Sequence, residues 1–275
     1  FYMGLNKEAL EAAEALQYVN LEGERLWTTE DFVKMCEALR DNGPTTVPGI
    51  VYCGGQGGDQ GTRALVNNLY SSSIVGEDGS WNIDANGVKA LELLKEMYDA
   101  QSIDKGSDMA AADELQKFQQ ETCAMTFCWG TSNAKSYATE DFTQISVPFP
   151  SDDGVPELEY LVNGFCVFDN KDEARAEAAK RLIAFICDDA TWGPESVKRT
   201  GAFPVRASFG NLYEGDEEMS LLASWTKYYG PYYNTRDKFA AMRTQWWNML
   251  QRVFDEGNVQ AQVDVFNTES NKDAA

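Results

Sequence analysis

The sequence predicts an α/β protein with two lobes. Its 275 residues are enough for two separate hydrophobic cores, and 43% hydrophobic with 24% charged residues is typical of a globular protein. Short apolar segments alternate with helical patterns: residues 47–53 and 123–128 each lead into a polar turn and then a helix. Such strand-to-helix corners are where α/β proteins place their ligand sites.

The first third of the chain predicts a strand, two helices and a second strand. Residues 1–6 predict a strand that leads into a helix near residues 7–16. Thr28 or Thr29 is a candidate N-cap, because two acidic residues follow it and favour the positive end of a helix. Asn42-Gly43 ends that helix, and residues 47–53 predict the next strand.

A glycine-rich loop over residues 54–63 follows this strand and precedes a helix over residues 64–70. Its glycine spacing fits neither of two common nucleotide-binding motifs, G-x-x-x-x-G-K-[ST] and G-x-G-x-x-G, so a nucleotide ligand is disfavoured. Its glycines let a ligand approach the backbone closely, although an ordinary flexible loop would have the same composition. Five of its side chains could bind hydroxyl groups: Gln56, Asp59, Gln60, Thr62 and Arg63.

The stretch from residue 118 to 133 is the centre of the prediction. A helix runs into an apolar strand, the strand ends at an apparently exposed Trp129-Gly130, and Thr131 opens another helix. The flat face of Trp129 suits a sugar ring, because ring C–H groups stack on indole. The alternative is a buried tryptophan that closes a strand-to-helix corner.

The rest of the chain predicts more helices than strands. We expect helices over residues 86–100, 169–188, 237–255 and 258–267, and strands over residues 145–150 and 159–168, with Asn163 inside the latter. Trp246 and Trp247 lie about 100° apart on their helix, so one is expected in the core and the other towards a cleft. The tail, residues 270–275, is expected to be disordered.

Composition excludes several function classes. A formal net charge of −21 repels nucleic acid and anionic membrane surfaces, so we expect neither as a partner. The absence of histidine excludes Ser-His-Asp and Cys-His catalysis. The six cysteines form no C-x-x-C pair, and the acidic run over residues 78–84 lacks the glycine and final glutamate of a calcium loop. We therefore expect no metal and no cofactor.

The order of segments resembles the extracellular solute-binding proteins of ATP-driven carbohydrate importers, the maltose-binding-like group. Each matching segment by itself is a weak signal for the family, whereas the order and spacing of all the segments together are specific. The segments are residues 6–10, 27–32, 118 with 123–125 and 129, 147–150, 162–165, 177–179 with 182–185, 201 with 204, and 254–257.

The resemblance implies a periplasmic-binding-protein-like fold of type II, with two lobes joined by crossover hinge strands. Residues 1–160 would form the second lobe, residues 161–207 part of the first, and residues 208–275 helices that return to the second. It also implies sugar binding without catalysis, a membrane permease as partner, and a monomer that is periplasmic or a cell-surface lipoprotein. The family carries a large first-lobe segment before the part that begins here at Phe1, so either this chain is a fragment or its numbering starts late. If it is a fragment, we expect weak or no sugar binding by this chain.

The resemblance also points to site residues. Trp129 and the region from Arg243 to Trp247 match positions where aromatic residues stack on sugar. With the glycine-rich loop, the candidate ligand-binding residues are Gln56, Asp59, Gln60, Thr62, Arg63, Trp129, Asn163, Tyr232, Arg243, Trp246 and Trp247. Two alternatives stay open: a glycosidase with paired carboxylates, and a protein that binds a polyol, a glycerol phosphate or a polyamine.

Overall fold

A computed structural model describes residues 1–272 and divides the chain into two compact units. Unit 1 comprises Phe1–Tyr160 together with the chain from Tyr228 onward, and unit 2 comprises Leu161–Lys227. The chain therefore leaves unit 1 once, after Tyr160, and returns to it at Tyr228. Residues 273–275, part of the predicted disordered tail, lie outside the described residues.

Unit 1 is built on a five-stranded sheet with the order β3-β2-β4-β1-β5. Its strands are β1 (Tyr2–Asn6), β2 (Val47–Tyr52), β3 (Asp104–Gly106), β4 (Cys123–Trp129) and β5 (Gln144–Val147). β2 pairs in parallel with β3 and β4, whereas β1 is antiparallel to both β4 and β5. The carboxyl ends of β2, β4 and β5 therefore share one edge of the sheet, and β1 starts there.

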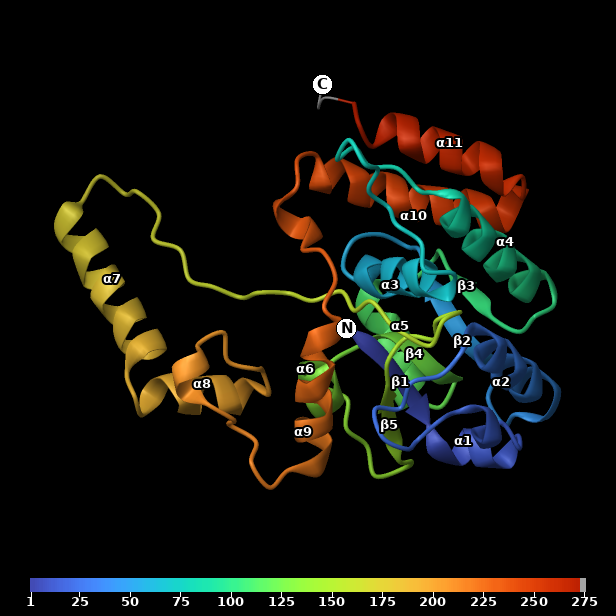
Figure 1. Cartoon of the computed structure of the whole chain (residues 1–275), viewed down its shortest axis with the longest axis horizontal. Coiled ribbons are helices and arrows are strands. Elements are labelled where there is room, and N and C mark those ends of the chain that lie inside the picture. Colours follow the sequence, from blue (N-terminus) through green and yellow to red (C-terminus); the bar gives the residue numbers. More distant parts are fainter. Residues whose placement is uncertain (273–275) are drawn as a thin grey trace. The chain divides into compact units, whose positions relative to one another are not determined.

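Helices cover this sheet, with α1 (Lys7–Ala12) following β1 directly (Figure 1). α2 (Thr29–Asn42), α3 (Asp59–Leu69) and α5 (Ala111–Gln119) contact the strands. α4 (Ala85–Asp99), α10 (Phe239–Glu256) and α11 (Val259–Glu269) stack beyond α3. α6 (Thr131–Ser136) follows β4. The last part of the chain is thus held to unit 1 through α3.

Local signals in the sequence explain where several helices begin and end. The Thr28 hydroxyl accepts a hydrogen bond from the Asp31 N–H at 3.1 Å, which confirms the predicted N-cap of α2, and Gly43 is its C-cap. The Asp84 carboxylate accepts from the Gly87 N–H at 2.8 Å and starts α4. These caps depend on residues a few positions apart, so the sequence alone predicts them.

Two glycines let elements of unit 1 pack closely. A Cβ at Gly61 would lie 2.1 Å from the Phe127 carbonyl oxygen, so α3 can approach β4 only because this residue has no side chain. A Cβ at Gly4 would lie 2.8 Å from the Trp129 ring. Both contacts lie at the edge of the sheet where the parallel strands end.

The structure corrects several expected elements. Residues 159–168, expected as a strand, carry no strand pairing, because an extended segment becomes a strand only beside a partner strand. α7 (Glu173–Asp188) is capped by Asp172, so it starts later than the predicted residue 169. β3 and α8 (Trp192–Thr200) were not predicted. Ser270 is buried and the Asn271 side chain bonds to Trp81, so the tail is ordered at least to this point.

Unit 2 contains α7, α8 and α9 (Glu217–Ser224), and α7 packs against α8. The Tyr213 hydroxyl donates to the Ala202 carbonyl at 2.7 Å and ties the loops after α8 together. α7 has no buried residue, although its sequence has an apolar side. Large apolar side chains of unit 2 are exposed: Leu161, Val162, Phe165, Val167, Phe168, Leu182, Phe185, Trp192 and Val205.

Candidate functional site

The candidate site lies at the edge of unit 1 where β2 and β4 end. The chain leaves β2 at Tyr52, turns through residues 53–58 and enters α3 at Asp59. The helix therefore starts five residues earlier than predicted. Asp59, Gln60, Thr62 and Arg63 belong to its first turns and are buried, rather than lying on an open loop as expected.

Asp59 is the centre of a buried ion-pair network. Its carboxylate accepts hydrogen bonds from Arg63, one helical turn along α3, and from Arg243 of α10, with Arg243 Nε 2.6 Å from Asp59 Oδ2. The Gly57 N–H donates to the same carboxylate at 3.1 Å. Burial alone would raise the pKa of Asp59, but the hydrogen bonds from Arg243 and the charge of Arg63 lower it below its ordinary value. Asp59 is therefore ionised at neutral pH.

Arg63 joins this network to the segment that leaves unit 1. Its Nε and Nη2 atoms donate to the two carboxylate oxygens of Glu159 at 2.7 Å and 2.9 Å. Burial raises the pKa of Glu159, and the charge of Arg63 opposes that rise. Because both oxygens of Glu159 accept from one guanidinium, the carboxyl group is an ionised partner in a bidentate pair.

α10 presents one stripe of side chains to this region: Phe239, Arg243, Trp247 and Gln251, spaced four residues apart. Arg243 reaches Asp59, and the Gln251 amide donates to the Cys53 carbonyl at 2.6 Å. The Phe239 ring centroid lies 5.7 Å from Arg63 Cζ and 5.5 Å from Arg243 Cζ. Trp247 lies between Arg243 and Gln251 on this stripe, on the helix face whose neighbouring side chains contact Asp59 and Cys53.

The two adjacent tryptophans have the different environments that the sequence predicts. Trp246 is fully buried; its indole N–H donates to the Thr62 hydroxyl at 2.9 Å and its ring packs edge-on against Phe266. Trp247 is partly exposed. Trp246 and Thr62 thus connect α10 to α3 inside the core, and of the two indoles only Trp247 has surface to offer a ligand.

Trp129 is buried, so the expectation that it is exposed is wrong. Tyr2 pairs with Trp129 whereas Gly4 pairs with Thr126, which leaves one extra residue in β4. The Trp129 ring packs edge-on against Phe118 of α5, with 5.3 Å between ring centroids, and closes the corner between α5 and β4. The structure thus agrees with the alternative given above, a buried tryptophan, and the Trp129 ring has no surface for a sugar in this arrangement.

Accessible polar and aromatic groups surround the network. Gln56 is exposed, and Gln60 is 8% exposed; within residues 1–272 neither side-chain amide has a hydrogen-bond partner. Tyr232 is partly exposed, and its ring centroid lies 5.2 Å from that of Tyr160. Tyr160 stacks on Tyr229 at 4.5 Å with an interplanar angle of 6°. These groups offer the flat faces and hydrogen-bond donors that a polyhydroxylated ligand needs.

The prediction from sequence missed Phe239, Tyr160 and Tyr229. Phe239 could have been found, because it lies four and eight residues before Arg243 and Trp247 on the same helix face. The two tyrosines meet through the bridge between Leu158 and Tyr229, which joins segments about 70 residues apart, and no local pattern indicates that pairing. Asn163, another predicted ligand residue, is exposed in unit 2.

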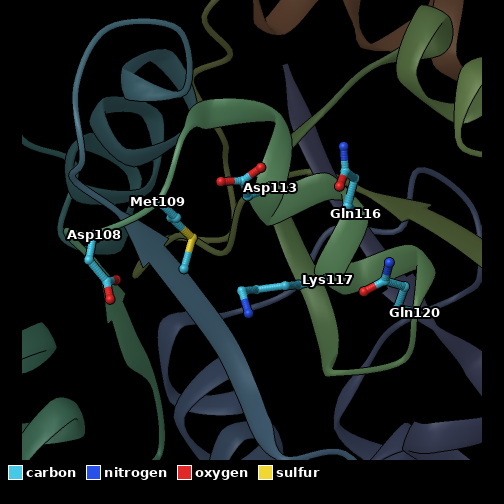
Figure 2. Close-up of a pocket in the computed structure, with 6 residues that line it drawn as sticks. All are labelled: Asp108, Met109, Asp113, Gln116, Lys117 and Gln120. Carbon is cyan, nitrogen blue, oxygen red and sulfur yellow. The ribbon is translucent and has the colours of Figure 1, made fainter.

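A hollow elsewhere on unit 1 offers a poorer site. It has a volume of about 370 Å³ and lies between the loop after β3 and helix α5 (Figure 2). Its lining residues are Asp108, Met109, Asp113, Gln116, Lys117 and Gln120. It holds no aromatic ring, and none of these side chains is buried. Among residues 1–272, no three His, Cys, Asp or Glu side chains gather as they would around a metal ion.

Sequence comparison assigns the chain to a family. Residues 1–219 match the bacterial extracellular solute-binding proteins, and the chain belongs to this family. The family binds solutes and is not catalytic, which removes the glycosidase alternative. No curated protein matches the chain. No helix in residues 1–272 has both the length and the apolar character needed to cross a membrane.

Solved structures share the fold at low sequence identity. A putative oligosaccharide periplasmic-binding protein from a Synechococcus species has a TM-score of 0.70 at 12% identity, over 98% of this chain and 71% of its own. Maltose-bound MalE3 of T. maritima gives 0.69 at 14%, over 98% and 69%. A solute-binding protein of Agrobacterium radiobacter in complex with ribitol gives 0.67 at 17%, over 98% and 68%. The fold is therefore α/β and periplasmic-binding-protein-like, and the chain spans about two thirds of these structures.

Proposed function

We propose that this chain binds a carbohydrate, namely an oligosaccharide, and delivers it to the permease of an ATP-driven importer. The observation that carries the proposal is the α10 stripe, in which partly exposed Trp247 lies between Arg243 and Gln251. The side chains of Arg243 and Gln251 contact Asp59 and the Cys53 carbonyl, at the two ends of the loop that carries Gln56. Indole stacks on the C–H face of a sugar while amides bind its hydroxyl groups.

The proposed site divides the candidate residues into two groups. Gln56, Gln60, Tyr232, Phe239 and Trp247 would contact the ligand, because each has accessible surface or an unpaired amide. The other predicted residues of unit 1 would act indirectly by holding these in place, since they are buried and most are bonded to one another: Asp59, Thr62, Arg63, Trp129, Arg243 and Trp246.

The same proposal assigns the units to lobes. Unit 1 would be the second lobe of the binding protein, and unit 2, with Asn163, part of the first. The exposed apolar side chains of unit 2 would pack against more of the first lobe, because the solved structures extend beyond the matched two thirds. The protein would act as a monomer outside the cell, periplasmic or lipid-anchored, with the permease as its partner.

A polyol is the second candidate ligand, because the ribitol-bound protein of Agrobacterium radiobacter shares the fold. A polyol offers the same hydroxyl groups as a sugar without a flat ring face. Trp247 therefore separates the two candidates: a ring sugar depends on stacking, and an open-chain polyol depends mainly on the amides.

Titration of intrinsic tryptophan fluorescence tests the proposal. The titrants are maltose, maltotriose, ribitol, glycerol 3-phosphate and putrescine, at up to about 100 mM, because one lobe edge alone should bind only at millimolar concentrations. We expect saturable changes with maltotriose in the natural chain. Isothermal calorimetry, which does not depend on the replaced indole, should show that Trp247→Ala abolishes this binding and Trp247→Phe retains it, with unchanged circular dichroism. Binding of putrescine or glycerol phosphate in preference to every sugar and polyol would refute the proposal.

A further inference from the structure

The four charged side chains at the start of α3 form a closed set. Asp59 and Glu159 supply two negative charges, and Arg63 and Arg243 supply two positive charges, so the set is neutral. The side chains of Arg63, Asp59 and Glu159 are 0%, 1% and 8% exposed. Arg243 is the most accessible member, with 12% of its side chain exposed.

We propose that Asp59 is a specificity-determining residue that neutralises Arg243 and, together with Glu159 on Arg63, restricts the site to uncharged ligands. The inference rests on the proposed function, because it concerns the same site. Without Asp59, Arg243 beside an amide-lined loop would attract a phosphate or a carboxylate, through the bidentate hydrogen bonds that guanidinium groups form with such anions. With Asp59 in place, Arg243 Nε and Nη2 are already used by its carboxylate.

The geometry supports the same conclusion for cations. Both carboxylates of the set accept from guanidinium groups, so neither is available to an ammonium group. The neighbouring Glu157 is exposed and bonds to the Tyr233 hydroxyl at 3.4 Å instead of to either arginine. Because the four side chains of this set sum to zero charge, the net charge of −21 comes from residues outside it.

Single substitutions unbalance the set in opposite directions. Asp59→Asn leaves one excess positive charge, with Arg63 still held by Glu159 and Arg243 free to bind an anion. Arg243→Gln leaves one excess negative charge, with Asp59 still held by Arg63 and by the Gly57 N–H. The double variant is neutral again. Each single variant keeps a buried ion pair, and either alone suffices for the test if the other fails to fold.

The test uses inorganic phosphate and putrescine as probes, with isothermal calorimetry on the whole chain. We expect Asp59→Asn to bind phosphate at least about tenfold more tightly than the natural chain, and Arg243→Gln to bind putrescine more tightly by a similar factor. The double variant should lose both gains. A general loosening of the structure would not predict this loss, so the double variant separates loosening from a charge effect. Circular dichroism confirms that each variant is folded.

Two results would overturn the inference. One is a folded single variant whose probe binding equals that of the natural chain, and the other is a folded double variant that keeps the tighter binding of either probe. Neither probe is a carbohydrate, so the outcome does not depend on sugar binding. Failure of the maltotriose titration would refute the proposed function while leaving the charge test valid.

Discussion

Glu114 is a single residue whose charge state affects the stability of the fold. It lies on α5, is 1% exposed, and its Oε1 atom accepts a hydrogen bond from the Phe127 N–H of β4 at 3.1 Å. Burial raises its pKa from the ordinary 4.5 to about 7, against the opposing hydrogen bonds from Thr126 and Phe127. A neutral carboxyl group is thus favoured inside unit 1 until the pH approaches neutrality.

Stability should therefore fall as the pH rises from about 4.5 to about 7, because over this range the native chain keeps a proton that the unfolded chain has released. The difference between the two pKa values corresponds to about 3 kcal/mol in the free energy of unfolding. Glu114→Gln removes this titration. Urea unfolding at pH 5 and pH 8 should show a larger loss for the natural chain than for the variant, and parallel pH profiles would contradict the assignment.

At the scale of elements, α3 links the candidate site to the segment that leaves unit 1. Its first turn carries Asp59 and Arg63, and Arg63 binds Glu159. Near its end, the Asn68 side chain accepts from the Glu157 N–H and donates to the Glu157 carbonyl, both at 2.7 Å. One helix thus fixes both the ligand loop and the outgoing segment.

Asn68→Ala should destabilise the protein by about 1–3 kcal/mol, because it leaves two partly buried backbone groups of Glu157 without their side-chain partner. Asn67→Ala is the matched control: the residue is adjacent and equally buried, but its amide reaches only the Tyr233 hydroxyl, at 3.5 Å. Urea unfolding should show the larger loss for Asn68→Ala, with faster hydrogen exchange at residues 157–159. Equal losses for the two variants would mean that the amide does not anchor this segment.

The sequence predicts an element well when the residues that fix it are neighbours in the chain, and poorly when those residues are far apart. The N-cap at Thr28 and the apolar strand β4 depend on neighbouring residues and were predicted. The start of α3 at Asp59 was missed, because Asp59 pairs with Arg243, 184 residues away, and Arg63 pairs with Glu159, 96 residues away. Helical spacing indicated that one of the adjacent tryptophans is core, but only tertiary packing decides that it is Trp246.

For the whole molecule, the division into two units makes a prediction about the segment that leaves unit 1. Residues 161–170 have no regular secondary structure and are exposed, with Phe165 63% and Phe168 85% accessible. Proteases need an extended, accessible backbone, and within the strands and helices of unit 1 such a backbone arises only by local unfolding. The connection should therefore be cut before any site in the sheet.

Limited chymotrypsin digestion should produce a first cut after Phe165 or Phe168, identified by mass spectrometry. The fragment that ends there contains the whole five-stranded sheet, and it should remain associated with the chain from Tyr228 onward through contacts of α10 and α11 with α3 and α4. The double variant Phe165→Ser with Phe168→Ser should slow this first cut without changing the melting temperature, because both side chains are exposed. A first cut between residues 1 and 150 would instead show that unit 1 opens more readily than the connection, and that the two-unit description is wrong.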